Sequence, residues 1–198
     1  MHLNNENLFS PEHADAWRKA GIEPLTFDRE KLTEKTSSAP AWVHFGAGNI
    51  FRAYLARACQ ELIEAGEYDK GVIAAEGFDF EIIDMAFNPY DNLFILVTLK
   101  SDGNADKKAI ASITEALKAH IKYEDFTRLR EIFRQDSLQM ASFTITEKGY
   151  SLQNPAKETP PDILRDFENG PAEPRSYMGR ISSLVYERFI NGGKPAGG

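Results

Sequence analysis

The run Gly46-Ala47-Gly48 carries the clearest chemical signal in the chain, because it lies between an apolar stretch and a segment with helical periodicity. A glycine at position 46 permits a tight turn, and one at position 48 lets the backbone approach a phosphate without a Cβ in the way. A helix that starts near Asn49 would direct its free N–H groups and its positive dipole end at that phosphate. The run therefore predicts a cradle for the diphosphate of a dinucleotide, which extends from Gly46 to Ile50.

Two charged side chains are placed to complete such a site. Arg52 lies one turn into the expected helix, where its guanidinium can hold a phosphate or a carboxylate through paired hydrogen bonds. Glu76 ends the next apolar run, where a carboxylate can accept hydrogen bonds from an adenosine ribose and repel a 2′-phosphate. This charge favours NAD over NADP. Asp79 is a rival for the same role, and a solvated loop acid is the other interpretation.

A third candidate follows a later apolar run, at Thr144-Ile145-Thr146-Glu147. Because the carboxyl ends of parallel strands line the ligand crevice of open α/β sheets, we expect Thr146 or Glu147 to face the ligand. Capping of a turn is the alternative role for this segment. The remaining chemistry-bearing residues predict no site: the four histidines lack metal-ligand spacing, and His44 and Cys59 are expected to be buried. We assign neither a metal site nor a catalytic residue.

The elements that must position these residues follow an α/β order. Short apolar runs predict strands at 42–45, 71–75, 93–99 and 140–145, and we expect 109–114 to pair back as a hairpin arm. Residues 151–174, which hold five prolines, are expected to be irregular. Spacings of three and four between apolar residues predict helices at 49–65, 81–87, 123–135 and 176–190. The expected fold is a Rossmann-like, doubly wound, mainly parallel sheet.

The pattern divides the chain into an N-terminal helical arm at 1–40 and a nucleotide-binding domain at 41–198. Such a sheet normally continues with another strand after a helix like 176–190, and none follows. We therefore expect the chain to be truncated after this helix. A sheet edge left uncovered in this way would invite self-association.

Composition excludes several classes of protein. The 198 residues carry 30 acidic and 23 basic side chains, a net charge of −7, which disfavours a nucleic-acid-backbone binder. A single cysteine excludes an intramolecular disulfide framework. The chain has neither a signal-peptide pattern nor an apolar run long enough to cross a membrane. We expect a cytoplasmic protein with a small-molecule partner, without nucleic-acid or membrane binding.

Three ordered segments resemble the mannitol dehydrogenase family of polyol and uronate oxidoreductases. The first is the run from Val43 to Ala53, in which Phe51 stands at the third glycine of the general fingerprint and an Arg-Ala pair follows, as in the family. The others are Ser112-Ile-Thr-Glu115 and Thr144-Ile-Thr-Glu-Lys-Gly-Tyr150. The resemblance spans roughly residues 41–192.

The resemblance implies the NAD-binding part of a zinc-independent enzyme that transfers hydride between a nicotinamide cofactor and a sugar alcohol or hexuronate. The family's catalytic Lys, Asn and His lie in a second, mostly helical domain. Lys148 and Lys194 lack their spacing, so we expect this chain alone to be inactive. The alternatives are an S-adenosylmethionine-dependent methyltransferase domain and a non-catalytic dinucleotide-sensing or interaction module.

Overall fold

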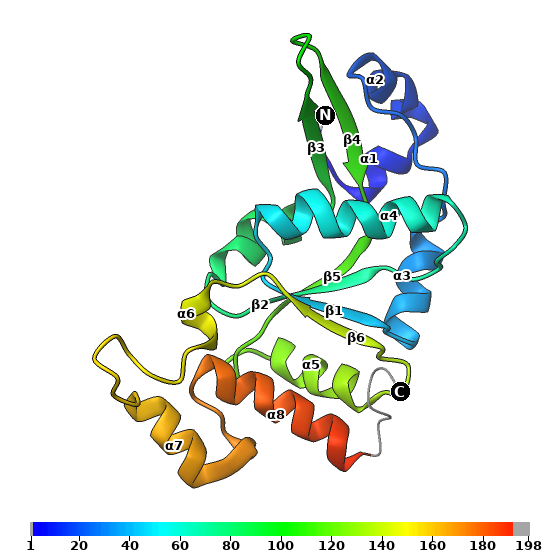
Figure 1. Cartoon of the computed structure of the whole chain (residues 1–198). Helices are drawn as coiled ribbons and strands as arrows, with labels where there is room; N and C mark the ends of the chain where they lie inside the picture. The colour runs from blue at the N-terminus through cyan, green and yellow to red at the C-terminus, as the bar shows by residue number, and fades with distance from the viewer. Residues whose placement is uncertain (1, 192–198) are drawn as a thin grey trace.

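A four-stranded parallel sheet forms the centre of the computed structural model, which describes residues 2–191 apart from the side chain of Lys148 (Figure 1). The strand order is β5-β2-β1-β6. β1 pairs in parallel with β2 on one side and β6 on the other, so the strand order reverses at β1, as at the switch point of a doubly wound sheet. The strands are Trp42–Phe45 (β1), Val72–Glu76 (β2), Ile113–Lys118 (β5) and Met140–Phe143 (β6).

Helices cover both faces of this sheet, which confirms the expected fold class (Figure 1). One face carries the helical segment made of η2 (Phe51–Leu55) and α4 (Ala56–Glu64), together with η3 (Ile83–Phe87). The other carries α5 (Asp125–Arg134) and α8 (Tyr177–Ile190). Side chains of β2 alternate between the two cores, so this strand is buried on both faces, as a central parallel strand must be.

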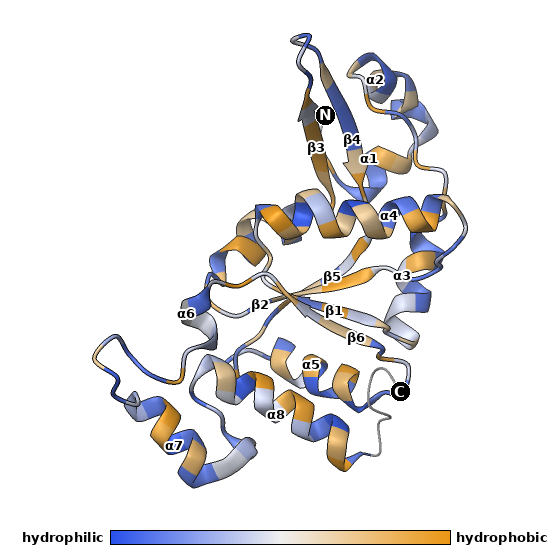
Figure 2. Cartoon of the chain, viewed as in Figure 1, coloured by the Kyte–Doolittle hydropathy of each residue, from blue (hydrophilic) through white to orange (hydrophobic). Residues whose placement is uncertain are grey.

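The strand expected at 93–99 is confirmed, but it does not belong to the central sheet. Residues 93–99 form β3 (Phe94–Leu99), which pairs antiparallel with β4 (Ala105–Ile110) in a separate hairpin. The second arm of the hairpin therefore starts before the expected 109–114. The strand that pairs with β2 at the edge of the central sheet is β5. β4 begins with charged, exposed residues, so it lacks the apolar run by which strands are recognised; Figure 2 shows it mostly hydrophilic beside hydrophobic β3.

The segment 151–174 is also more regular than expected. It contains α7 (Pro161–Asn169) and the 3₁₀ turn η5 (Gly170–Ala172), and it follows the short α6 (Glu147–Tyr150). Pro161 opens α7 in the first turn, where the missing N–H of proline costs no hydrogen bond, so the proline count was misleading here. The expected helix at 176–190 is confirmed as α8, with Ser176 as its N-cap.

The first forty residues contribute to the core. Arg29 is buried at the start of α3 and donates hydrogen bonds to carbonyl oxygens of Ala111, Asp91 and Ile113. Leu32 packs in the same cluster as Phe51. The elements of this region are α1 (Asn5–Phe9), η1 (Pro11–His13), α2 (Ala14–Lys19) and α3 (Arg29–Ser38), and η4 (Asn88–Tyr90) precedes the hairpin.

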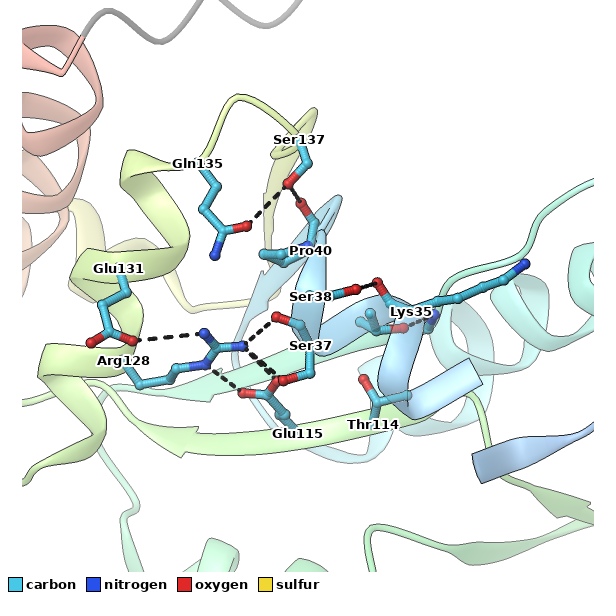
Figure 3. Close-up of polar contacts among 12 residues, drawn as sticks. Lys35, Ser37, Ser38, Pro40, Thr114, Glu115, Arg128, Glu131, Gln135 and Ser137 are labelled. Carbon is cyan, nitrogen blue, oxygen red and sulfur yellow. Dashed lines mark hydrogen bonds and ion pairs between the residues drawn. The ribbon is translucent and has the colours of Figure 1, made fainter. Parts of the chain in front are cut away.

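Arg128 of α5 links its own helix to β5 and to α3 (Figure 3). Its Nε and Nη2 donate to the two carboxylate oxygens of Glu115 at 3.1 and 2.9 Å, and Nη2 also donates to the carbonyl oxygen of Ser37 at 3.0 Å. The hydrogen bonds with Glu115 raise the pKa of Arg128. This paired contact attaches α3 and α5 to the edge strand of the sheet.

Residues 192–198, which include Lys194, lie outside the described part of the chain. Within residues 2–191, no helix has the length and apolar content that a membrane crossing requires.

Candidate functional site

The two glycines of the turn lie at the carboxyl end of β1 and differ in what surrounds them. Gly46 has φ +109°, and a Cβ there would lie 2.6 Å from the carbonyl oxygen of Thr144, so both conformation and space require glycine. A Cβ on Gly48 would meet nothing within 4 Å. Gly46 therefore serves the fold, whereas Gly48 borders open space in which another molecule can approach the backbone.

The helix that follows begins at Asn49 and points its N-terminus into this open space. Gly48, Asn49 and Ile50 are exposed, and the N–H groups of a first helical turn have no partner within the helix. These donors and the positive dipole end suit an anion. Ala47 differs from its neighbours, because it is buried and its N–H donates to Oε2 of Glu76 at 2.8 Å.

Arg52 lies one turn into the helix, as predicted. Its Nη2 donates to Oδ1 of Asn49 at 2.6 Å, and its guanidinium lies 5.7 Å from the ring centre of Phe87. Burial lowers the pKa of Arg52. Its Nε is buried without a hydrogen-bond partner among residues 2–191, so the contact with Asn49 uses only part of the donor capacity of this guanidinium.

Glu76 is only 7% exposed, and its carboxylate contacts backbone N–H groups from two loops. Oε2 accepts from Ala47, and Oε1 accepts from Phe78 at 2.8 Å and Asp79 at 3.2 Å. The structure thus places Glu76 beside the glycine turn, as expected, but with both oxygens already engaged. Asp79, the rival for the ribose contact, is exposed.

The segment after β6 reaches the same edge of the sheet. Thr146 is exposed, and its carbonyl oxygen accepts a hydrogen bond from the N–H of Gly149 at 2.9 Å; Glu147 begins α6. Thr144, which begins this segment but was given no ligand role from the sequence, contacts the turn directly, because its Oγ1 lies 3.5 Å from the carbonyl oxygen of Gly46.

A hydrogen-bonded network between β1 and β6 lies beneath the turn, and sequence reasoning missed it. Fully buried His44 contacts Oγ of Ser142 through Nδ1 at 2.7 Å and Oγ1 of Thr144 through Nε2 at 2.8 Å. Its ring stacks on Phe51 with centroids 4.3 Å apart. The buried position of His44 was predicted, but its partners depend on which strand pairs with β1.

This network links folding to pH. Burial lowers the pKa of His44 from 6.5 to about 4, so between these values the unfolded chain binds a proton that the native chain excludes. Stability is therefore fully present above pH 6.5 and lost as the pH falls towards 4. We expect His44 to reduce the free energy of unfolding by about 2 kcal/mol between pH 7 and pH 5. Urea unfolding at both pH values measures this loss, and His44→Gln should lack it; an equal loss in His44→Gln would show that other groups cause it.

Other chemistry-bearing residues do not gather into a site. Cys59 is buried and free, and burial raises the pKa of its thiol to about 12, so it is an unreactive core residue as expected. No group of three His, Cys, Asp or Glu side chains in residues 2–191 could hold a metal ion.

A cavity of about 780 Å³ lies between α1 and α3, lined among others by Asn5, Phe9 and Arg29, but it includes no residue of the glycine turn. The turn lies instead at the carboxyl ends of the parallel strands, where open α/β sheets bind their ligands.

Comparison with known proteins finds relatives whose sequences are similar to almost the whole of this chain. D-mannonate oxidoreductase of Thermotoga maritima is 46% identical over 195 residues, which cover 98% of this chain and 36% of the relative. Altronate oxidoreductase of Bacteroides thetaiotaomicron is 24% identical over 160 residues, 78% of this chain and 30% of that protein. The chain thus spans about a third of the length of these relatives. No family model matches it.

Solved structures share the fold. D-sorbitol dehydrogenase in substrate-free form superposes with a TM-score of 0.75 at 20% identity, over 98% of this chain and 37% of that one. Mannitol 2-dehydrogenase of Pseudomonas fluorescens, in a ternary complex with NAD and D-mannitol, gives a TM-score of 0.73 at 22% identity, over 97% of this chain and 37% of that one. With the sequence relatives above, the chain belongs to the mannitol dehydrogenase family and corresponds to its amino-terminal, Rossmann-type part.

Proposed function

We propose that this chain binds NAD as the nucleotide-binding part of a zinc-independent oxidoreductase. The observation that carries the proposal is the open space in front of Gly48, at the N-terminus of a helix that starts at the switch point of a parallel sheet. The named complex of mannitol 2-dehydrogenase with NAD, which has the same fold, supports it. We propose the arm at 1–40 and the domain at 41–198 as its two parts.

The residues present fit the cofactor. The N–H groups of Gly48, Asn49 and Ile50, which are exposed residues, would hold the diphosphate, and Arg52 would support it with the guanidinium N–H groups that do not bond Asn49. Glu76 ends β2, Asp79 follows it and Thr146 follows β6, so all three lie at the carboxyl ends of the strands, where the two halves of a dinucleotide extend in opposite directions. When bound, the nicotinamide would accept or donate a hydride. The contribution of this chain would be to hold the dinucleotide that carries the nicotinamide ring in a fixed position.

The substrate we propose is a hexuronate and its reduced partner acid, or a sugar alcohol. The relative at 46% identity is named for D-mannonate and another for altronate, both six-carbon sugar acids, which favours the acid. No residue of this chain is assigned to proton transfer, and we propose that those groups lie in the portion of the relatives that this chain does not match. A methyltransferase is not favoured, because the relatives above are named oxidoreductases.

Titration with three ligands tests the cofactor proposal. We expect NADH to bind at least about tenfold more tightly than NADPH, since the carboxylates of Glu76 and Asp79 would repel the 2′-phosphate. S-adenosylmethionine should not compete. The fluorescence of the reduced nicotinamide measures binding of NADH and NADPH directly, and binding of S-adenosylmethionine by displacement of NADH. Tighter binding of S-adenosylmethionine would reverse the assignment, and the absence of any NADH binding would refute it.

A further inference from the structure

One peptide unit of the glycine turn, between Gly46 and Ala47, is contacted on one side by the last side chain of β2 and on the other by the first side chain after β6. On one side the N–H of Ala47 donates to Oε2 of Glu76 at 2.8 Å. On the other, Oγ1 of Thr144 lies 3.5 Å from the carbonyl oxygen of Gly46. Rotation of the Gly46–Ala47 peptide plane would therefore break both of these contacts.

The Glu76 contact is buried and shared between loops. Its second oxygen accepts from the N–H groups of Phe78 and Asp79, so the carboxylate joins the loop after β1 to the loop after β2. Hydrogen bonds from N–H groups to an ionised acceptor are stronger than those between neutral groups, and the side chain is 7% exposed. Glu76 is therefore bound to the backbone before any ligand arrives.

The Thr144 contact is the end of a chain of hydrogen bonds to which one consistent direction can be assigned. The indole Nε1 of Trp42 can only donate, and it donates to Oγ of Ser142 at 2.7 Å. Ser142 can then donate to Nδ1 of His44, and Nε2–H of His44 to Oγ1 of Thr144. This assignment leaves the hydroxyl hydrogen of Thr144 for the carbonyl oxygen of Gly46. In this assignment the imidazole of His44 is neutral, in agreement with its lowered pKa.

We propose that Glu76 and Thr144 are positioning residues, which fix the plane of the Gly46–Ala47 peptide and so direct the next N–H groups at the cofactor diphosphate. The inference rests on the proposed function. It gives Glu76 a role through the turn instead of direct contact with the ribose, and it leaves exposed Asp79 for that contact.

Paired substitutions at Thr144 test the carbonyl side. Thr144→Val removes the hydroxyl at nearly constant volume, and we expect the Kd for NADH to rise about tenfold, whereas Thr144→Ser should restore binding to within about twofold. Thr98→Val, at an exposed position of β3, is the matched control and should not change the Kd. Equal affinities for Thr144→Val and Thr144→Ser would overturn the proposal.

Amide hydrogen exchange in the free protein tests the N–H side. In Glu76→Gln we expect the Ala47 amide to exchange at least about tenfold faster, while the amide of Ala74, inside β2, keeps its rate. The Kd of this variant for NADH should rise in parallel, and that for adenosine, which has the ribose but no phosphate, should not change. An unchanged rate at Ala47, or an equal loss for adenosine, would contradict the proposal. Failure of the unmodified chain to bind NADH would instead refute the proposed function, and the exchange rates would still decide whether Glu76 holds the peptide.

Discussion

Gly48→Val is expected to raise the Kd for NADH at least about 100-fold, which corresponds to about 2.7 kcal/mol. The isopropyl group would fill the open space in front of the helix N-terminus and keep the diphosphate from the N–H groups of Asn49 and Ile50. Loss of even two hydrogen bonds to a charged group accounts for an effect of about this size. NADH fluorescence titration measures the affinity, and thermal unfolding shows whether the fold is intact.

The fold should tolerate this change, because Gly48 is exposed, has no positive φ and has no neighbour within 4 Å of a Cβ. Ala65→Val, at an exposed position at the other end of the same helix, is the matched control and should leave the Kd unchanged. Gly48→Ala should have an intermediate effect. An affinity for NADH in Gly48→Val equal to that of the unmodified chain would show that the diphosphate lies elsewhere.

Gly46→Ala is expected to damage the fold itself, with a loss of about 3 kcal/mol or more in the free energy of unfolding. The residue has φ +109°, which L side chains rarely adopt, and the new Cβ would lie 2.6 Å from the carbonyl oxygen of Thr144. That oxygen belongs to the backbone after β6, so relief requires β1 and β6 to move apart. Urea unfolding of the two chains measures the difference.

Gly66→Ala separates the two causes. Gly66 also has a positive φ, +75°, but a Cβ there meets nothing within 4 Å. We expect this control to lose only about 1 kcal/mol, the cost of the backbone conformation alone. Equal losses at positions 46 and 66 would mean that the contact with Thr144 contributes nothing, and that the close approach of the two strands at the turn is not essential.

The fold could be predicted where the signal is local. The apolar runs of β1, β2 and β6 and the periodicity of α4, α5 and α8 are visible within a few residues each. β4 and β5 were misassigned because charged residues interrupt their apolar pattern and because the pairing of β5 with β2 is decided by distant parts of the chain. The helix α7 was missed because proline in a first turn is compatible with a helix.

The site divides in the same way. The glycine turn and the helix after it were predicted, because both depend on consecutive residues. The contacts of Glu76 with Ala47 and of His44 with Thr144 could not be derived, since they require the register in which β1 pairs with β2 and β6. One signal was present: each of the two apolar strands carries a single hydrogen-bonding side chain of this kind, His44 in β1 and Ser142 in β6, and the two residues pair directly.

Amide chemical-shift mapping with NADH tests the central claim most directly, because it reports which backbone N–H groups meet the ligand. The account predicts the largest shifts at Gly48, Asn49 and Ile50, with smaller shifts at Asp79 and Thr146. The same pattern at Gly48–Ile50 should appear with ADP, which shares the diphosphate. Shifts confined to the cavity between α1 and α3, around Asn5 and Arg29, with none at the turn, would contradict it.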